Sequence, residues 1–266
     1  AAGSSDPDGD PLTYDWDFDD GMPHASGPTS THIYTATGTY TATLTVSDGR
    51  GGSASATVRI DVGNTPPVPV IDAPDANLRF RVDQSITLQG GATDAQDDIL
   101  PGSSLSWRVI LHHNDHTHPF LPPTPGISVT ITAPPPEDLA ATSTSYLEVF
   151  LSATDSRGLT SVITRELRPN IVPLTFATAP AGLEIAINDS TLTGPQLLTS
   201  WEGYVLNVAA ADPQDALGQT WRFDRWSDGG AAAHSIATPA EATTYTATFT
   251  PAAGPKYITL LPVIRK

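Results

Sequence analysis

Aromatic and acidic residues alternate strictly near the start of this chain. The run Tyr14-Asp15-Trp16-Asp17-Phe18 places an aromatic residue at every second position, with aspartates between them. Successive side chains of a β-strand point to opposite faces of a sheet. The pattern therefore predicts a strand with its aromatic side chains in a core and its carboxylates in water. A helix would not segregate the two kinds of residue in this way.

A second alternation covers residues 38–46, where Tyr40, Ala42, Leu44 and Val46 share one predicted face and threonines occupy the other. Threonine is β-branched and favours strands. The 266 residues include 25 prolines and 21 glycines, and only 16% of them are charged. This composition supplies many turns and leaves little room for long helices, so we predict an all-β fold.

An aspartate-rich turn followed by a tryptophan-bearing strand occurs three times, before Trp16, Trp107 and Trp221. This internal repeat predicts three β-sandwich domains in series, a number that the length of the chain allows. Two proline-rich linkers, residues 64–69 and 168–173, are expected to separate them. The expected divisions are residues 1–63, 66–169 and 171–251, followed by an apolar tail at residues 252–266.

The segments GSSDPDGDPLTYDWDF and HIYTATGTYTATLTVSDGRGGS closely resemble a polycystic-kidney-disease (PKD) repeat, over residues 1 to about 62. That family is an immunoglobulin-like β-sandwich common on bacterial secreted proteins. The resemblance therefore implies immunoglobulin-like domains and an extracellular or cell-surface location. A PKD repeat normally has a strand before its GSSDPDGD turn, so we expect a truncated first strand and an open sheet edge.

Residues 105–120, 145–155 and 174–249 resemble the C-terminal accessory domains of secreted bacterial glucose/sorbosone-dehydrogenase-like proteins. In that family the pyrroloquinoline quinone (PQQ) cofactor and the hydride chemistry belong to a propeller domain, which these residues do not resemble. The resemblance therefore implies an accessory role for this chain and no enzymatic activity.

The formal net charge of −16, with only 13 lysines and arginines, argues against nucleic acid as a partner and suits divalent cations. The chain has no cysteine, which excludes disulfides, thiolate metal sites and a cysteine nucleophile. No serine lies in a nucleophile-elbow sequence. No apolar run reaches the roughly 18 residues of a transmembrane helix, so we predict no transmembrane segment.

Aspartates in the predicted turns are candidate calcium ligands, because calcium takes several carboxylate and carbonyl oxygens. The alternative is that Asp-Pro and Asp-Gly sequences only form turns, with each aspartate accepting hydrogen bonds from nearby backbone N–H groups. A set of candidates occurs in each expected domain, and the third set, Asp212 with Asp215, is the weakest. The sets of the first two domains are Asp6, Asp8, Asp10 and Asp48, and then Asp94, Asp97, Asp98 and Asp155.

Four of the seven histidines lie within seven residues, at His112, His113, His116 and His118. Alternate residues of an extended strand are about 7 Å apart, too far for neighbouring pairs to bind one ion without a bend. A hairpin at Asn114-Asp115 would bring them together and create a site for zinc or copper. The alternative is a polar hairpin, or a sugar-facing loop, with hydrogen-bonding imidazoles.

Aromatic residues cluster in the third expected domain, and stacking on sugar rings would let such a module hold polysaccharide. We expect Trp221, Phe223 and Trp226 to lie mostly in the core. Trp201, beside Glu202-Gly203, and Tyr204 are the candidates for an exposed carbohydrate platform.

The apolar, strand-prone segment Tyr257–Ile264 could act as an anchoring tail, or could add as a strand to the open sheet edge of another molecule. Three functions follow. The leading one is a non-catalytic extracellular accessory region that spaces, anchors or targets a secreted protein to polysaccharide or other cell-surface components. The second is a structural surface protein that self-assembles into a fibre or layer. An enzyme is the third, and only the histidine cluster could support it.

Overall fold

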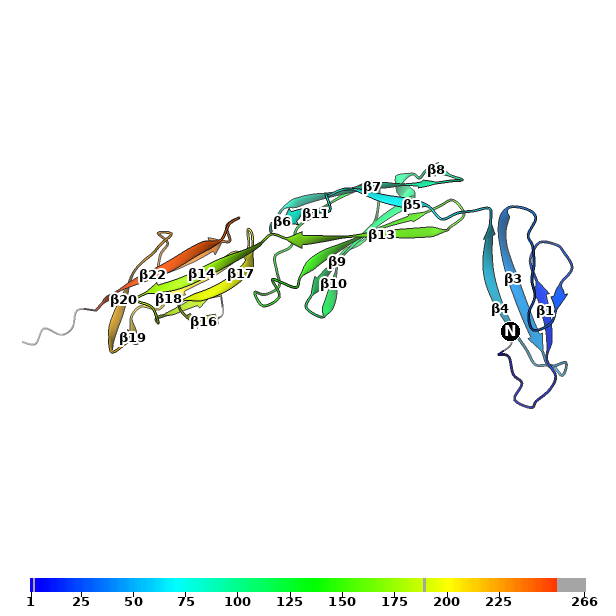
Figure 1. Cartoon of the computed structure of the whole chain (residues 1–266), viewed down its shortest axis with the longest axis horizontal. Coiled ribbons are helices and arrows are strands. Elements are labelled where there is room, and N and C mark those ends of the chain that lie inside the picture. Colours follow the sequence, from blue (N-terminus) through cyan, green and yellow to red (C-terminus); the bar gives the residue numbers. More distant parts are fainter. Residues whose placement is uncertain (2, 189, 253–266) are drawn as a thin grey trace, which may run out of the picture.

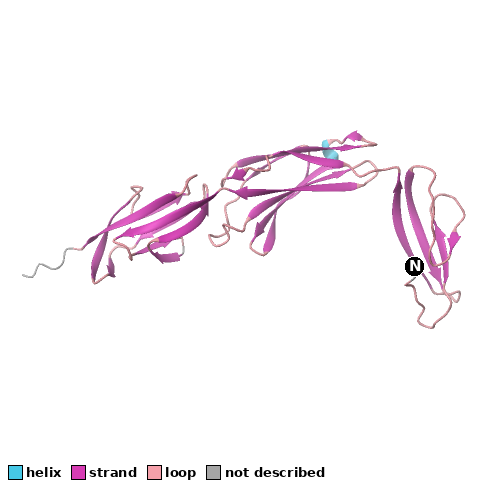
Figure 2. Cartoon of the chain, in the orientation of Figure 1, coloured by secondary structure: helices cyan, strands magenta, loops and turns pink. Residues whose placement is uncertain are grey.

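The computed structural model describes residues 1, 3–188 and 190–252. Strands and loops make up almost all of this region, with one short 3-10 turn, η1, at Gly102–Ser104 (Figure 2). The all-β fold class predicted from the sequence is confirmed. No helix among the described residues is long and apolar enough to cross a membrane.

The first part of the chain forms one antiparallel sheet with the strand order β2-β1-β3-β4. Both alternating segments of the sequence are strands of this sheet, and Trp16 pairs with Leu44 across them. The strands are β1 (Thr13–Asp17), β2 (Ala25–Ser26), β3 (Gly38–Ser47) and β4 (Ser53–Val62).

A second sheet does not cover this first sheet within residues 1 and 3–62. His32 stacks on Phe18, with ring centroids 4.1 Å apart, and Tyr34 stacks on Tyr40 at 4.3 Å, so a loop covers one end of the apolar face. Elsewhere the cover is incomplete, although Ala42 and Leu44 are buried. Trp16, which we expected to be buried, is therefore only half-buried, and Val58 is exposed.

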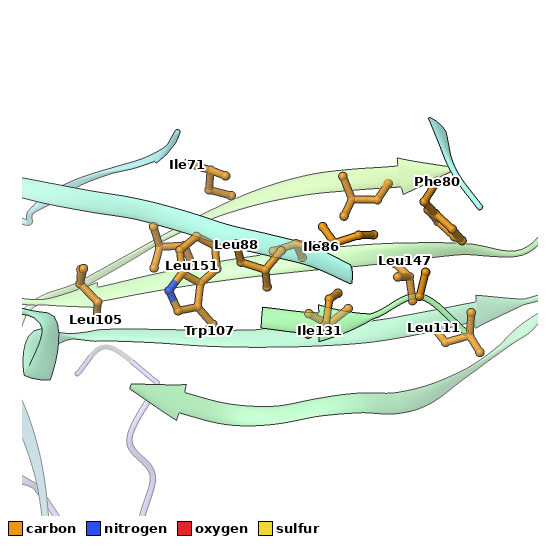
Figure 3. Packing of buried hydrophobic residues seen from close by; sticks show 14 of the residues in the cluster. Ile71, Phe80, Ile86, Leu88, Leu105, Trp107, Leu111, Ile131, Leu147 and Leu151 are labelled. Atoms are coloured by element: carbon orange, nitrogen blue, oxygen red, sulfur yellow. The ribbon is translucent and has the colours of Figure 1, made fainter. Parts of the chain in front are cut away.

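The second part is a sandwich of two sheets, one with the order β10-β9-β12-β13-β6 and one with the order β11-β7-β5, with β8 paired to β7. Trp107, Leu88 and Leu151 meet between the two sheets (Figure 3). The strands are β5 (Val68–Ala73), β6 (Arg79–Phe80), β7 (Ser85–Asp94), β8 (Asp98–Ile99), β9 (Leu105–His113), β10 (His116–Pro125), β11 (Ser128–Thr132), β12 (Tyr146–Thr154) and β13 (Thr160–Pro169).

The third part is also a sandwich, with the sheets β17-β14-β22-β20-β19 and β16-β15-β18-β21. Its core contains Phe176, Trp226 and Phe249. The strands are β14 (Ile171–Ala179), β15 (Glu184–Ile187), β16 (Ser190–Thr193), β17 (Gln196–Trp201), β18 (Val205–Ala210), β19 (Gln214–Ala216), β20 (Gln219–Trp226), β21 (Ala233–Ala237) and β22 (Thr243–Pro251).

The expected proline-rich linkers are shorter than the sequence suggested. Strand β13 ends at Pro169 and β14 begins at Ile171, so only Asn170 separates them. Pro69 lies in β5, an edge strand that pairs only with β7, where a missing N–H is tolerated. Pro173 lies in the part of β14 that pairs with β17 but not with β22.

The three parts follow one another along an extended molecule (Figure 1). Among the described residues, strands pair only within one part. The division of the chain into domains at the expected residues remains a prediction, because the core of the second part also contains Trp201 of β17.

Candidate metal centre

A two-residue turn at Asn114-Asp115 joins β9 to β10 and forms the hairpin that the histidine spacing required. Asn114 has a positive φ of 50°, a conformation that asparagine adopts more readily than most residues. His113 pairs directly with His116, and Leu111 pairs with His118. Residues paired across a hairpin share a face, as do alternate residues of one strand. The three imidazoles therefore lie on the same side.

Glu137, in the loop after β11, completes a group of four side chains. One possible ligand atom from each of His113, His116, His118 and Glu137 lies within 4.8 Å of all the others. Nδ1 of His113 is 3.3 Å from both His116 Nε2 and Glu137 Oε2. Nε2 of His118 is 3.1 Å from Glu137 Oε1. We call these four residues the His/Glu cluster.

The cluster is partly buried and partly open to solvent. His113 is only 6% exposed, because it follows the core-facing residues Val109 and Leu111 along β9. The Nε2 atoms of His113 and His118 are buried and form no hydrogen bond. Buried polar atoms usually have a partner, so these two nitrogens are unusual in a folded protein.

His112 does not belong to the cluster. It follows the opposite face of β9, where it stacks on Tyr146 with ring centroids 4.3 Å apart and contacts Glu148 through Nε2, at 2.8 Å. The prediction grouped His112 with the other three, but adjacent residues of a strand point to opposite faces. Conversely, Glu137 was not predicted as a member of the site. It lies in the irregular segment Pro134-Pro135-Pro136-Glu137, and no spacing rule relates that segment to the hairpin.

Two of the first four calcium candidates, Asp6 and Asp48, bind the backbone of their own turns, and Asp10 lies 3.2 Å from the guanidinium of Arg50. Asp6 Oδ1 accepts hydrogen bonds from the N–H groups of Asp8 and Asp10, and Asp48 accepts them from Arg50 and Gly52. Within residues 1, 3–188 and 190–252, the His/Glu cluster is the only group of three or more histidine or acidic side chains whose possible ligand atoms all lie within 4.8 Å of one another. The hydrogen bonds of Asp6 and Asp48 are those of turn-forming aspartates, and calcium at this set remains a prediction.

The second calcium set behaves in the same way. Asp94 Oδ1 accepts the N–H groups of Gln96 and Asp97, and buried Asp155 accepts those of Arg157 and Leu159. Asp98, in the short strand β8, is exposed.

Asp97 binds the loop after β12. Its carboxylate accepts hydrogen bonds from the backbone N–H and the hydroxyl of Ser156, at 2.7 and 2.8 Å. These bonds lower the pKa of Asp97 below its ordinary value of 3.8. This carboxylate is therefore engaged within the protein.

Trp201 cannot serve as an exposed carbohydrate platform. Its side chain is fully buried, packs edge to face on Phe80 with centroids 5.6 Å apart, and donates a hydrogen bond from Nε1 to the carbonyl oxygen of Thr142. The prediction failed because Trp201 fills the junction between two sandwiches, which the sequence of one domain cannot show. Tyr204 is partly buried against the cores of both sandwiches. The predicted strand-donating segment Tyr257–Ile264 lies outside the described residues.

Comparison with known families identifies the first part of the chain. Residues 1–62 match the family model of the PKD domain. No curated protein matches this chain. None of the matches supports the resemblance of the later residues to sorbosone-dehydrogenase-like proteins, which remains a prediction.

Several solved structures match over most of this chain. Escherichia coli α2-macroglobulin activated by porcine elastase is 12% identical, with a TM-score of 0.32, and the match covers 86% of this chain and 28% of that one. A Ca2+-stabilised adhesin that helps an Antarctic bacterium bind ice is 11% identical, with a TM-score of 0.25, over 88% of this chain and 65% of that one.

A third match is SGBP-B of the Bacteroides ovatus mixed-linkage glucan utilization locus, in complex with a mixed-linkage heptasaccharide. It is 11% identical, with a TM-score of 0.17, over 88% of this chain and 60% of that one. The chain spans less than two thirds of each of these three proteins. Likeness at this level supports no statement about function.

Proposed function

We propose that this chain is a non-catalytic extracellular accessory region that spaces and anchors a larger secreted protein. The observation that carries the proposal is the joint between the second and third parts, where Trp201 of β17 is buried in the core of the second part. A spacer must hold its ends apart. A joint that shares one core resists bending, because bending would expose a buried indole.

Backbone hydrogen bonds reinforce this joint. The N–H of Val82 donates to the carbonyl oxygen of Glu202 at 2.9 Å, and the N–H of Asn170 donates to that of Phe80 at 2.7 Å. The N–H of Glu202 in turn donates to the carbonyl oxygen of Asn170 at 3.0 Å. The single linking residue is thus bound on both sides, which supports a fixed direction between the two sandwiches.

The extracellular location is supported by the PKD match over residues 1–62. We propose polysaccharide, or another cell-surface component, as what the region anchors to. A pull-down of the purified chain on a panel of insoluble polysaccharides, with calcium and with chelator, tests this partner class. Retention on particular glycans would support anchoring. Absence of retention on every glycan would leave spacing as the function and remove polysaccharide as the partner.

The open first sheet favours a second candidate function, assembly into a filament or layer. A cleft of about 430 Å³ lies beside it, lined in part by Leu44 and Val46 of β3 and by Ala54 and Ala56 of β4. Strand β4 pairs only with β3, so its other edge is free among the described strands. Unpaired strand edges are templates for further pairing.

The proposed occupant is residues 257–264 of a second molecule. Strand β22, which precedes the tail, lies at the opposite end of the molecule from the first sheet (Figure 1), so pairing between molecules would be head to tail. Light scattering of the full chain and of a variant lacking residues 256–266 tests this. Concentration-dependent polymers that vanish on deletion are expected from assembly, and two identical monomers would exclude it.

A further inference from the structure

We propose that His113, His116, His118 and Glu137 bind a zinc ion, and that this ion holds the loop of residues 137–145 in place against the third sandwich. The inference goes beyond the proposed function, because a spacer needs no metal. It rests on the geometry of the His/Glu cluster, on the unpaired Nε2 of His118 and on the contacts of the loop that carries Glu137.

The spacing of the cluster suits a tetrahedral ion. Zinc binds imidazole nitrogens and carboxylate oxygens at about 2.0–2.2 Å, which places neighbouring ligand atoms roughly 3.3–3.5 Å apart. Contacts of His113 with His116 and Glu137 are both 3.3 Å, and that of His118 with Glu137 is 3.1 Å. Three separations within the cluster are thus close to those that one tetrahedral ion requires, and one possible ligand atom of each residue lies within 4.8 Å of the others.

The unpaired Nε2 of His118 indicates a missing electrophile. This nitrogen is buried and lies close to Glu137 without forming a hydrogen bond. A bound cation would accept a lone pair from histidine without requiring a donor proton. Asp115 and Asp138 also approach the cluster, at 3.4 Å from His116 Nδ1 and 3.7 Å from His113 Nε2, and their charge favours a cation.

The chemical types of the four side chains favour one class of ion. Calcium and magnesium prefer oxygen ligands, whereas imidazole suits zinc, copper and nickel. Four protein ligands complete a tetrahedral shell and leave no open position, which is typical of structural zinc sites. We therefore assign the cluster to zinc in a structural role.

The loop that carries Glu137 continues directly to the joint. Thr144 donates a hydrogen bond to Asn114 at the tip of the hairpin, at 2.9 Å. Leu139 packs against the core of the third part. The carbonyl oxygen of Thr142 accepts the indole N–H of Trp201 at 2.8 Å. An ion that ties Glu137 to the hairpin would therefore hold residues 137–145 in the position that binds Trp201.

The experiment uses the full chain without an affinity tag, freed of metal by chelator and dialysis and titrated with zinc chloride by calorimetry. We expect one zinc per chain in the wild type and in His112→Gln, the matched control on the other face of β9. The double variant H116Q/H118Q should bind no zinc at the site, and Glu137→Gln should bind at least about tenfold more weakly. Circular dichroism of each variant verifies that it folds.

The second readout is amide hydrogen exchange with and without zinc. Ordering of the loop should slow exchange in residues 137–145 and in residues 197–204, which are distant from the ligands in sequence. No stoichiometric zinc in the folded wild type, or undiminished zinc in H116Q/H118Q, would overturn the site. Binding of copper but not zinc would overturn the assignment of the ion. Slower exchange confined to the hairpin would overturn the role of the ion in holding residues 137–145 in place.

Discussion

The indole N–H of Trp201 donates a hydrogen bond to the carbonyl oxygen of Thr142, 2.8 Å away, and so links β17 of the third sandwich to a loop of the second. The hydroxyl of Thr142 also lies 3.1 Å from the hydroxyl of Thr199, which belongs to β17 as Trp201 does. Both Trp201 and Thr142 are almost completely buried. Trp201 of the third sandwich therefore completes the core of the second sandwich.

Replacing Trp201 by alanine should destabilise the protein, because it empties a large site beside Phe80. Truncation of a buried aromatic side chain typically lowers the free energy of unfolding by about 3–5 kcal/mol. Trp201→Phe keeps most of the ring but leaves the Thr142 carbonyl unpaired, at a cost of about 1–3 kcal/mol. Urea unfolding of the three proteins measures both values. An unchanged midpoint for Trp201→Ala would show that the residue is exposed.

Asp155 should stabilise the loop after β12 without calcium. Its carboxylate accepts hydrogen bonds from the backbone N–H groups of Arg157 and Leu159. It also accepts one, at 2.7 Å, from the side-chain amide of Asn64, a residue of the connection from the first part. Asp155→Ala should lower the free energy of unfolding by about 1–3 kcal/mol, since it leaves partly buried donors unpaired.

The control for Asp155→Ala is Asp72→Ala, an exposed position of β5 outside the candidate calcium sets, where about 0.5 kcal/mol or less is expected. Melting temperatures are measured in calcium and in chelator. A turn-forming aspartate predicts the same loss in both conditions and no effect of calcium on the wild type. A loss that occurs only in calcium would instead identify Asp155 as a calcium ligand.

Acid should weaken the contact between Asp97 and Ser156. The folded state lowers the pKa of Asp97 below 3.8, because the backbone N–H and the hydroxyl of Ser156 bind its carboxylate. A lowered carboxyl pKa stabilises the fold above the pKa of the unfolded chain. That stabilisation is lost as the pH falls through the lowered value.

Asp97→Asn should therefore lose less stability than the wild type between pH 7 and pH 3, because the amide does not titrate. Urea midpoints of both proteins at the two pH values give the comparison. Equal losses in the two proteins would mean that Asp97 does not contribute to the acid sensitivity.

Much of the fold was predictable from periodicity. Strict alternation located β1 and β3, and the composition indicated an all-β protein, because both depend on local rules of strand geometry. The burial of Trp226 does not follow from the alternation of side chains along a strand. A register shift between Phe223 and Arg225 interrupts the alternation of β20, and Trp226 is fully buried while Phe223 is only partly so. A bulge of this kind depends on the neighbouring strand.

The candidate site was predictable only in part. Histidine density and the Asn114-Asp115 turn located the three histidines of the His/Glu cluster, because a hairpin relates nearby residues. Glu137 lies in a loop more than eighteen residues after His118, and only the packing of that loop brings its carboxylate close to His113. The burial of Trp201 depends on contact between two sandwiches, so no pattern within either sequence segment could reveal it.

Small-angle X-ray scattering of the monomeric full chain tests the central claim, a spacer with a fixed joint, most directly. We expect an asymmetric distribution of interatomic distances with a long tail, and a profile that agrees with the extended arrangement of the three parts (Figure 1). The variant Trp201→Ala should deviate from that profile, because its joint is free to bend. A symmetric distribution typical of a compact particle, for the wild type, would contradict the proposed spacer.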